Sequence, residues 1–342
     1  MSGPGTEAVS QRPVAVLGAG SWGCALAIHL ARLGHPVRLW AHRPEHLAIL
    51  AQQHENRRHL PGTPFPQSLQ VQGALAHALA DTRLVLVAVP SHGFRATVEA
   101  AAPHLPGQTG LIWATKGLEP GTGRFLHEVL AELLGPRRCV AILSGPSFAR
   151  EVAAGLPTAI TVASSDAEFA GRAAACFHGG TMRVYTSDDV VGVELGGVVK
   201  NVLAIAAGIS DGLGFGANSR AALITRGLAE LVRLGAAVGA RSSTMMGLAG
   251  LGDLILTCTD DQSRNRRFGL ALGRGQGAGD AIRAIGQVVE GASVVSELLA
   301  LAARHAVEMP ICEQVERVVH AGLAPQKAVQ ALLARDPKQE DA

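Results

Sequence analysis

Short apolar runs alternate with longer helical patterns through the first half of the chain. An apolar run at residues 14–17 leads into a glycine-rich stretch, and helical spacing over residues 24–33 ends at Gly34 before a second apolar run at residues 37–40. The alternation continues with apolar runs at 84–89, 110–114, 140–143, 158–162 and 182–185 and with helical patterns at 94–102, 125–134 and 167–176. Strands that alternate with helices predict a doubly wound parallel sheet.

The pattern changes near Asp188, where the runs typical of strands stop. Helical patterns separated by glycine-rich turns fill the rest of the chain. We therefore expect a disordered tail over residues 1–12, a sheet domain over residues 13–187 and an all-helical domain over residues 188–342.

Lys200 lies inside the most apolar of these helical patterns. Only four of the 30 basic residues are lysines, which leaves 26 arginines. An amine, unlike a guanidinium, can lose its proton near neutral pH when it is desolvated or close to another cation, and acid–base catalysis requires that ability. Lys200 is therefore a candidate for proton transfer. The alternative is a lysine at the edge of a buried helix whose amine reaches water.

Length and charge limit the classes of protein to consider. At 342 residues the chain is long enough for two domains, and its small net charge of +2 argues against nucleic acid as a partner. The five cysteines are scattered, which predicts buried reduced thiols, with no disulfide framework and no metal site. Residues 1–12 lack the apolar core of a signal peptide, and Glu194 and Lys200 interrupt the longest apolar helix. We expect no membrane span and a soluble cytoplasmic protein.

The glycine-rich stretch has the G-x-G-x-x-G pattern between a strand and a helix. In that context Gly18 makes the turn, Gly20 lets the backbone approach a pyrophosphate, and Gly23 lets the helix pack on the strand. The phosphates would lie at the helix N-terminus. The sequence therefore predicts a dinucleotide cofactor.

The end of the second predicted strand bears on which dinucleotide binds. An NAD site usually has an acidic residue there to hold the ribose hydroxyls, but this chain has Ala41, His42 and Arg43. Cationic and donor groups suit a 2′-phosphate, so we expect NADP(H) in preference to NAD(H). The alternative is that Arg43 is merely solvated before the next helix.

Polar turns follow several predicted strands. Ligands collect at the carboxyl ends of strands in this fold, so Lys116 and Ser147 are expected on the ligand side. Ser147 would otherwise begin a turn or a helix. In the helical half, Asp253 would either pair with an active-site lysine or cap a helix, and Glu290 would either cap a helix or reach the cofactor.

Ser263 has the character of a helix N-cap, which places Arg264 and Asn265 in the first turn. Arginine is unfavourable near the positive end of a helix dipole. The arginines at 264, 266 and 267 therefore predict an anion there, such as a substrate phosphate. A solvated face is the alternative.

Together these motifs resemble one family, the bacterial-type NAD(P)-dependent sn-glycerol-3-phosphate dehydrogenases. The resemblance covers nearly the whole chain past Arg12 and is looser at Asp260, Asp261 and the C-terminal tail. It rests on GAGSWG, WAHR, TKG, SGPSFA, ELGGVVKNVLAIAAGISDGLGFGANSRAALITRGLAE, GLAGLGDLILTC, SRNRRFG and GQVVEG. It implies a Rossmann-like domain followed by an all-helical C-terminal domain of the 6-phosphogluconate-dehydrogenase type.

By position, the resemblance implies that Lys200 transfers the proton. The substrate contacts that it implies are Lys116, Gly145, Ser147, Lys200, Asp253, Ser263, Arg264 and Asn265. The nucleotide contacts that it implies, beside Gly18, Gly20 and Gly23, are Ser21, Trp22, His42, Arg43, Lys116, Ala149, Arg264, Val288 and Glu290.

The expected reaction is the reversible reduction of dihydroxyacetone phosphate by NADPH to sn-glycerol 3-phosphate, the precursor of glycerophospholipids in this family. Lys200 would donate the proton, Lys116 would polarise the carbonyl or neutralise the phosphate, and Asp253 would keep the lysine charged or orient it. A reductase of another small keto or hydroxy acid, such as ketopantoate, and a non-enzymatic NADP(H) sensor are the alternatives. Two questions are left open: whether the enzyme also uses NAD(H), and whether it forms a homodimer.

Overall fold

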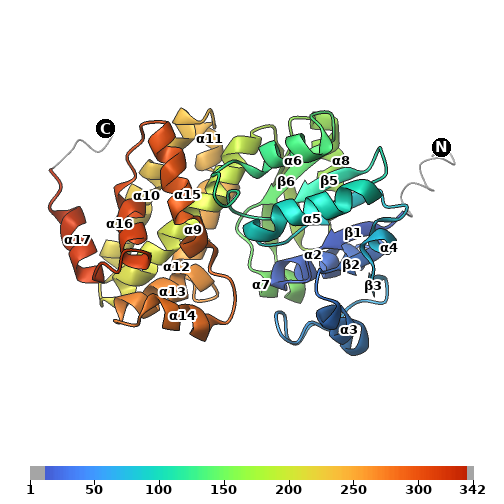
Figure 1. Ribbon diagram of the computed structural model, residues 1–342, viewed down its shortest axis with the longest axis horizontal. Helices are drawn as coiled ribbons and strands as arrows, with labels where there is room; N and C mark the ends of the chain where they lie inside the picture. The colour runs from blue at the N-terminus through green and yellow to red at the C-terminus, as the bar shows by residue number, and fades with distance from the viewer. Residues whose placement is uncertain (1–11, 337–342) are drawn as a thin grey trace. The chain divides into compact units, whose positions relative to one another are not determined.

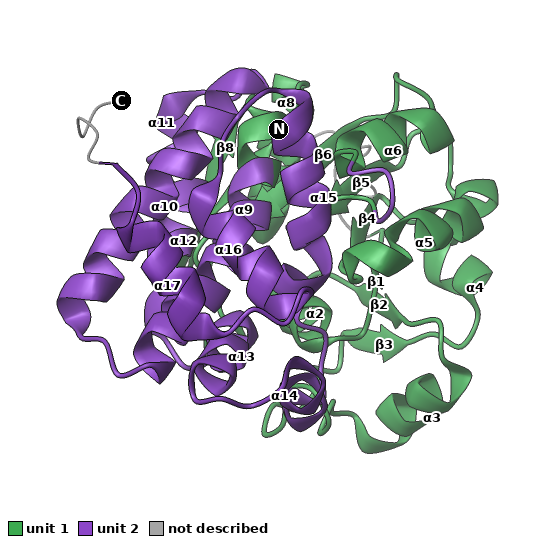
Figure 2. Cartoon of the chain, turned by 60° about the vertical axis from the view of Figure 1, so that its left-hand side comes forward, with its two compact units in different colours: residues 1–119, 124–194 green, residues 120–123, 195–342 purple. Residues whose placement is uncertain are grey.

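The computed structural model describes residues 12–336 (Figure 1), so the tail predicted over residues 1–12 lies outside the described residues except for Arg12. The chain divides into two compact units (Figure 2). Unit 1 contains the residues up to Glu119 together with Arg124–Glu194, and unit 2 contains Pro120–Gly123 and the residues from Leu195 onward. The division falls inside one long helix, whereas the sequence pattern placed it after residue 187.

Unit 1 is built on an eight-stranded sheet whose order is β3-β2-β1-β4-β5-β6-β7-β8 (Figure 1). The strands are β1 (Val14–Leu17), β2 (Val37–Trp40), β3 (Leu69–Val71), β4 (Leu84–Val87), β5 (Gly110–Trp113), β6 (Val140–Ser144), β7 (Thr158–Ala163) and β8 (Met182–Ser187). Val14 in the central strand β1 pairs with Val37 on one side and with Leu84 on the other, both in parallel register. The reversal of strand order on the two sides of β1 brings the ends of β1 and β4 to the place where this fold binds ligands.

The prediction of an all-parallel sheet is wrong at one pair, because β6 and β7 run antiparallel. Their connection contains a single short helix, α7 (Ala149–Ala154). Six helical residues span only about 9 Å, which is too short to carry the chain back along a five-residue strand. The chain therefore re-enters the sheet from the end at which it left, and β8 then pairs in parallel with β7.

Helices lie on both sides of this sheet. The remaining helical segments of unit 1 are α2 (Ser21–Arg32), α3 (Pro44–Gln53), α4 (Leu75–Leu79), η1 (Ser91–Gly93), α5 (Phe94–Ala101), η2 (Ala102–His104), α6 (Leu126–Leu134) and α8 (Ala167–Phe177). Helix α2 packs against α7 and α8, and α5 packs against α4 and α6. This arrangement confirms the doubly wound architecture.

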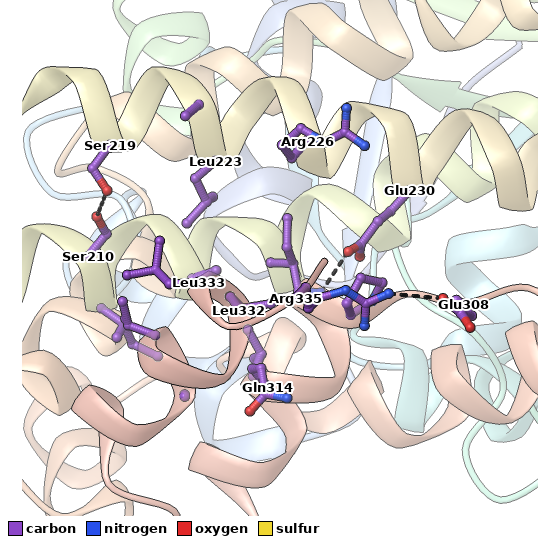
Figure 3. A pocket seen from close by; sticks show the side chains of 18 of the residues that line it. Ser210, Ser219, Leu223, Arg226, Glu230, Glu308, Gln314, Leu332, Leu333 and Arg335 are labelled. Carbon is purple, nitrogen blue, oxygen red and sulfur yellow. Dashed lines mark hydrogen bonds and ion pairs between the residues drawn. The ribbon is translucent and has the colours of Figure 1, made fainter. Parts of the chain in front are cut away.

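The regular elements of unit 2 are all helical among its described residues. Its elements are α9 (Val190–Gly212, from Leu195), α10 (Ala217–Ala237), α11 (Ser242–Met245), the π-helical turn η3 (Leu248–Gly252), α12 (Asp253–Thr259), α13 (Arg264–Gly273), α14 (Ala278–Ile285), α15 (Glu290–Arg304), α16 (Pro310–Val319) and α17 (Pro325–Leu333). Among the described helices α9 alone is long and apolar enough to cross a membrane, but 89% of its apolar window is buried inside the protein. Such burial is typical of a core helix. Elsewhere in this unit α10, α16 and α17 contribute to the walls of a cavity (Figure 3).

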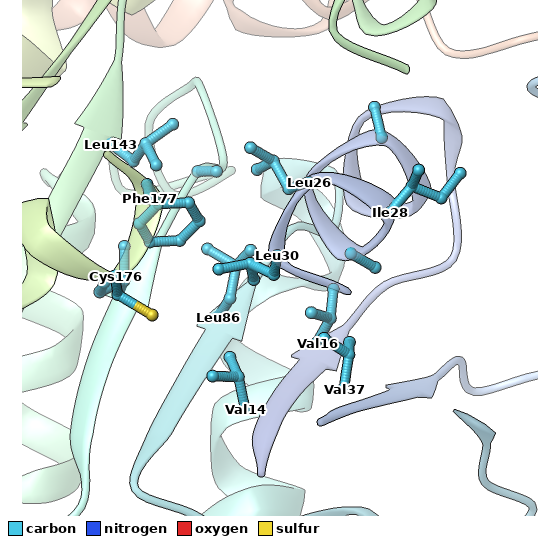
Figure 4. Packing of buried hydrophobic residues seen from close by; sticks show 14 of the residues in the cluster. Val14, Val16, Leu26, Ile28, Leu30, Val37, Leu86, Leu143, Cys176 and Phe177 are labelled. Carbon is cyan, nitrogen blue, oxygen red and sulfur yellow. The ribbon is translucent and has the colours of Figure 1, made fainter. Parts of the chain in front are cut away.

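The core of unit 1 supports the strand ends. Figure 4 shows side chains of α2 and α8 packed over the central strands, with Leu26, Leu86, Leu143 and Phe177 almost completely buried. Each such side chain contributes roughly 1.5–3 kcal/mol by leaving water. Four of the five cysteines are buried as predicted, whereas Cys139 is partly exposed.

Candidate active site

Glycine shapes the turn between β1 and α2. Gly18 has a φ of +118°, and a Cβ there would lie 2.5 Å from the carbonyl oxygen of Ala88. A Cβ at Gly23 would lie 1.8 Å from the carbonyl oxygen of Gly18. A Cβ at Gly20, by contrast, would meet no neighbouring atom within 4 Å. The turn itself therefore requires Gly18 and Gly23, while Gly20 leaves space beside the backbone for a ligand.

Helix α2 begins at this turn, with Gly20 as its N-cap and Ser21 and Trp22 in its first turn. No side chain caps the helix, so its first N–H groups are available to an anion. The indole Nε1 of Trp22 is buried without a hydrogen-bond partner among the described residues. Ala149 begins α7, which packs against α2. The space, the helix N-terminus and the unused donor fit the pyrophosphate of a dinucleotide.

The end of β2 lies next to the same turn, because the Gly18 N–H donates to the Trp40 carbonyl at 2.7 Å. His42 and Arg43 follow β2 after Ala41, and both are exposed. No acidic side chain occupies the end of this strand. The two exposed residues fit the 2′-phosphate of NADP(H) better than the ribose hydroxyls of NAD(H).

Three predicted substrate contacts converge beyond β5 and β6. Lys116 Nζ donates to the Gly145 carbonyl at 3.5 Å, and Ser147 Oγ donates to the same oxygen at 3.0 Å. Gly145 has a φ of +142°, and a Cβ there would lie 3.0 Å from the Cα of Ile160. Only glycine adopts this positive φ easily, and with it the Gly145 carbonyl points towards the side chains of both Lys116 and Ser147.

In unit 2, Lys200 is 6% exposed in the middle of α9. Its Nζ donates to Asp253 Oδ1 at 2.5 Å and to Thr257 Oγ1 at 3.0 Å. Asp253 and Thr257 lie four residues apart on α12 and therefore on one face of that helix. The amine thus turns inward to a carboxylate and a hydroxyl, which excludes the alternative in which it reaches out to water.

Close backbone packing sets the distance between α9 and the segment that carries Asp253. A Cβ at Gly196 would lie 2.3 Å from the carbonyl oxygen of Ala249, in the π-helical turn η3. A Cβ at Gly250 would lie 2.1 Å from the carbonyl oxygen of Met245. Gly196 thus lets η3 lie directly on α9, and Gly250 lets η3 pack against the end of α11 (Ser242–Met245). Helix α12 then begins with Asp253, which is fully buried.

Asn201, the residue after Lys200, joins three helices. Its Nδ2 donates to Glu290 Oε2 at 3.2 Å, and its Oδ1 accepts from Asn265 Nδ2 at 2.9 Å. Asn265 Oδ1 in turn accepts the Gly291 N–H at 2.9 Å. The starts of α13 and α15 are therefore fixed against α9. We call Lys200, Asn201, Asp253, Thr257 and Asn265 the polar core of unit 2.

Ser263 is the N-cap of α13 as predicted, since its hydroxyl accepts the Arg266 N–H at 3.2 Å. Arg264 donates to the Val288 carbonyl at 3.3 Å, which brings together two predicted nucleotide contacts. The anion expected beside Arg266 is a part of the protein, because this buried side chain pairs with Asp211 at 2.6 Å and with Asp261. Arg267 is exposed.

One buried nucleophile lies near the polar core. Burial raises the pKa of Cys258 to about 12, and the nearby Lys200 charge opposes this shift only in part. The thiol therefore stays protonated at neutral pH, and thiolate chemistry is excluded at this cysteine.

Two members of the polar core, Thr257 and Asn201, received no role from the sequence. The spacing of Asp253 and Thr257 was a usable signal, because residues four apart share a helix face. For Asn201 the signal was that a second polar residue follows Lys200 in an apolar helix, which indicates a buried polar contact. The sequence could not identify the partners, because Asn265 and Glu290 are far away in the chain.

Comparisons with known proteins agree over most of the chain. The models for the N-terminus and the C-terminus of NAD-dependent glycerol-3-phosphate dehydrogenase match residues 13–170 and 189–330. A glycerol-3-phosphate dehydrogenase of Thioalkalivibrio sulfidiphilus, named as acting with NAD(P)+, is 60% identical over 332 residues, which cover 97% of this chain and 100% of that protein. Its counterpart in Nitrosococcus oceani is 59% identical and covers 95% of this chain and 94% of its own. The crystal structure of glycerol-3-phosphate dehydrogenase from Coxiella burnetii has a TM-score of 0.92 at 50% identity, covering 95% of this chain and 99% of the other.

Proposed function

This chain belongs to the NAD-dependent glycerol-3-phosphate dehydrogenase family, and on that premise we propose how its residues carry out the reaction. It is an oxidoreductase, a glycerol-3-phosphate dehydrogenase that uses NAD(P)+. In our proposal it catalyses the reversible reduction of dihydroxyacetone phosphate to sn-glycerol 3-phosphate.

Lys200 supplies the proton in this proposal. Hydride addition to the ketone carbon places a negative charge on the carbonyl oxygen, and an ammonium that gives up a proton there prevents a free alkoxide. The observation that carries this role is the buried pair of Lys200 with Asp253. A buried ion pair stabilises a fold no better than apolar side chains of the same size, so its presence in an apolar helix is best explained by chemistry.

Asp253 and Thr257 hold the amine in place. An ammonium has three N–H donors, and these two residues accept from it at 2.5 and 3.0 Å. The carboxylate also stabilises the protonated form that must be present before the proton is transferred. A fixed and charged donor is what general acid catalysis requires.

The start of α13 binds the substrate phosphate in this proposal. Ser263, Arg264 and Asn265 stand at a helix N-terminus, where N–H groups attract anions, and Asn265 is held by two hydrogen bonds. In unit 1, we assign Lys116 the neutralisation of substrate charge and Gly145 and Ser147 further substrate contacts, because the three meet at strand ends.

The nicotinamide cofactor supplies the hydride when it is bound. Ser21, Trp22 and Ala149 would hold its pyrophosphate beside the turn that Gly18, Gly20 and Gly23 form, and His42 and Arg43 would hold the 2′-phosphate of NADPH. We assign further nucleotide contacts to Arg264, Val288 and Glu290, which lie at the starts of α13 and α15. NADPH is therefore the preferred donor in our proposal.

The product and the cysteines suggest where the enzyme acts. sn-Glycerol 3-phosphate has the carbon skeleton and the phosphate of a glycerophospholipid, so we propose that it feeds lipid synthesis. Cys24, Cys139, Cys176, Cys258 and Cys312 are all free thiols. Free thiols suit a reducing compartment, and we therefore propose a cytoplasmic location.

The test follows NADPH absorbance with dihydroxyacetone phosphate as the acceptor, and repeats it with dihydroxyacetone and with NADH. We expect rapid oxidation of NADPH only with the phosphorylated ketone, and Lys200→Ala should lower turnover by about 10²–10⁴-fold while NADPH still binds. Lys327→Ala is the matched control, because this lysine is exposed on α17. Near-normal turnover of the Lys200 variant would remove the assigned role, and equal rates with dihydroxyacetone would remove the phosphate site.

A further inference from the structure

A buried asparagine reaches the turn between β1 and α2 from a distant part of unit 1. Asn56 is 1% exposed in the connection between α3 and β3, and the proposed chemistry does not use it. Its Nδ2 donates to the Ala19 carbonyl at 2.9 Å and to Cys24 Sγ at 3.2 Å. Ala19 precedes Gly20, the N-cap of α2, and Cys24 follows it inside the helix. One amide therefore holds the chain on both sides of this N-cap.

The surrounding hydrogen bonds fix the orientation of the Asn56 amide. Its Oδ1 accepts the His59 N–H at 3.1 Å, and its backbone carbonyl accepts the Leu60 N–H at 2.8 Å. The reversed amide would set Oδ1 against the Ala19 carbonyl and Nδ2 against the His59 N–H, and both hydrogen bonds would be lost. Leu60 is buried in the core of unit 1, which anchors the segment. Asn56 is therefore a fixed donor towards Ala19.

A second side chain donates to the same oxygen. His46 of α3 has its Nε2 3.2 Å from the Ala19 carbonyl. Because a carbonyl only accepts, the Nε2 of His46 carries the hydrogen in this contact. The rings of His46 and His59 meet edge to face with their centroids 5.7 Å apart, which packs α3 against the segment that carries Asn56. Two side chains from distant positions thus hold one carbonyl of the turn.

The Ala19 carbonyl matters because it belongs to the same peptide unit as the Gly20 N–H. A trans peptide is planar, so its carbonyl and its N–H point in opposite directions. The first helical hydrogen bond of α2 runs from the Cys24 N–H to the Gly20 carbonyl at 3.0 Å, which leaves the Ala19 carbonyl outside the helix. Asn56 and His46 bind this carbonyl from their side. The Gly20 N–H consequently points away from them.

We propose that Asn56, assisted by His46, is a positioning residue for the coenzyme and sets the direction of the Gly20 N–H for the pyrophosphate. This role rests on the proposed coenzyme site at the turn. A donor that is held in place before the ligand arrives loses no backbone freedom on binding, so the affinity for the ligand is higher. NADPH and NADH share the pyrophosphate, and the positioning therefore acts equally on both. The hydride and proton steps use other groups, so turnover at saturating coenzyme does not depend on it.

Fluorescence titration of the full-length protein with NADPH and with NADH tests the proposal. Asn56→Ala should raise both dissociation constants by roughly tenfold, while kcat at saturating coenzyme stays within about twofold of the wild type. Gln53→Ala, which removes an exposed amide at the end of α3, is the matched control and should change neither constant. An unchanged affinity in a folded Asn56→Ala variant would overturn the proposal, and so would a loss of kcat with unchanged affinity.

Two variants at His46 keep the test decisive if Asn56→Ala does not fold. His46 is only partly buried, so both variants should keep the unfolding temperature of the wild type. His46→Leu removes the donor and should raise both dissociation constants by roughly threefold. His46→Gln keeps an N–H donor on a side chain of similar reach and should restore the wild-type affinity. Equal affinities of the leucine and glutamine variants would overturn the proposal, because the hydrogen bond would then have no effect.

Gly20→Ala separates the positioning role from the proposed coenzyme site itself. Its methyl group enters the space beside the turn, so this variant should bind NADPH about tenfold more weakly. If Gly20→Ala weakens binding but neither Asn56→Ala nor His46→Leu does, the site stands and the positioning role is wrong. If none of the three variants weakens binding, the coenzyme binds elsewhere, and both the site and the positioning role are wrong.

Discussion

The nucleotide turn of unit 1 and the polar core of unit 2 are built from different parts of the polypeptide. The turn is made of backbone, and its shape depends on the absence of a Cβ at Gly18 and Gly23. The polar core is made of side chains that α9, α12 and α13 bring together. A binding loop of the first kind donates hydrogen bonds from its backbone N–H groups to a ligand and leaves room for it where Cβ atoms are absent. A site of the second kind can hold and move a proton, which is the role that we propose for Lys200.

The difference predicts how each region fails. A substitution in the turn should act through shape, because a new Cβ meets the backbone. A substitution in the polar core should act through charge, because its members are buried and tied to one another. The predictions below separate these two modes of failure, and the largest effect comes first.

The largest effect should follow from Asp253→Asn, which keeps the shape of the side chain and removes its charge. Lys200 would lose the carboxylate that lies 2.5 Å from its amine. Breaking a buried ion pair from one side costs roughly 3–5 kcal/mol. Loss of an oriented proton donor should lower turnover by about 10²–10⁴-fold. Urea unfolding and NADPH oxidation, measured on the same preparation, check both effects.

The double variant Lys200→Met with Asp253→Leu is the control for packing. Apolar side chains of similar size replace a buried pair with little loss, so this variant should recover most of the free energy of unfolding and none of the activity. If it were as unstable as Asp253→Asn, the damage would come from volume, and the argument from charge would be wrong.

Gly18→Ala and Gly20→Ala should separate the two uses of glycine within the turn. At Gly18 the positive φ costs about 1–2 kcal/mol in a non-glycine residue, and the contact with the Ala88 carbonyl adds about 1–3 kcal/mol. At Gly20 a methyl group enters open space, so stability should change by less than about 0.5 kcal/mol. NADPH binding to the Gly20 variant should still weaken by about tenfold, because the methyl group occupies the ligand's place. Urea unfolding and NADPH fluorescence titration check the pair, and equal destabilisation of the two variants would contradict this division.

The same contrast explains what the sequence could predict. The turn is contiguous, so its strand, glycines and helix were visible as one pattern. Seven of the strands were also located by their apolar runs, but the three-residue β3 was too short to stand out. The antiparallel pairing of β7 with β6 depends on how short α7 is, and the pattern of apolar residues does not predict that length.

For the polar core, the sequence indicated Lys200 and a pairing with Asp253 as one of two interpretations. The four-residue spacing of Asp253 and Thr257 was its only hint of Thr257, and nothing in it linked Asn201 to Asn265 and Glu290, because these contacts join residues 57 to 89 positions apart. It also suggested a ligand anion at Arg266, whose charge is met by Asp211 and Asp261. A pattern shows which residues are polar, whereas tertiary packing decides which of them meet.

Glu230 extends the comparison, since backbone groups hold this buried carboxyl. Its oxygens accept the Ile311 and Cys312 N–H groups at 2.6 and 3.3 Å. Burial raises the pKa of Glu230 from 4.5 to about 7, although these hydrogen bonds oppose the shift. A carboxyl with a raised pKa in the folded state contributes stability that is present below pH 4.5 and is lost as the pH rises through about 7. The shift corresponds to about 3 kcal/mol.

Urea unfolding of Glu230→Gln and of the wild type, at about pH 4.5 and about pH 8, measures this contribution. The wild type should lose about 3 kcal/mol relative to the variant between the two conditions, since glutamine does not ionise. Glu168→Gln, at a side chain that is 81% exposed on α8, should show no such difference. A constant difference between the wild type and Glu230→Gln would mean that folding does not raise the pKa of Glu230.

The smallest effect should come from Arg43→Ala, which tests whether side chains add anything to the backbone-built site of unit 1. Arg43 is exposed at the N-cap position of α3, so its removal should leave the free energy of unfolding nearly unchanged. Hydrogen bonds to a charged group contribute about 1.5–3 kcal/mol, so the KM for NADPH should rise roughly 10–100-fold while the KM for NADH stays constant.

Arg57→Ala, which removes another exposed arginine of unit 1, is the control and should change neither KM. Steady-state kinetics with both coenzymes make the measurement. An equal rise for NADPH and NADH would place Arg43 on a part of the cofactor that the two share, and coenzyme choice would then rest on His42 or on the backbone of the turn.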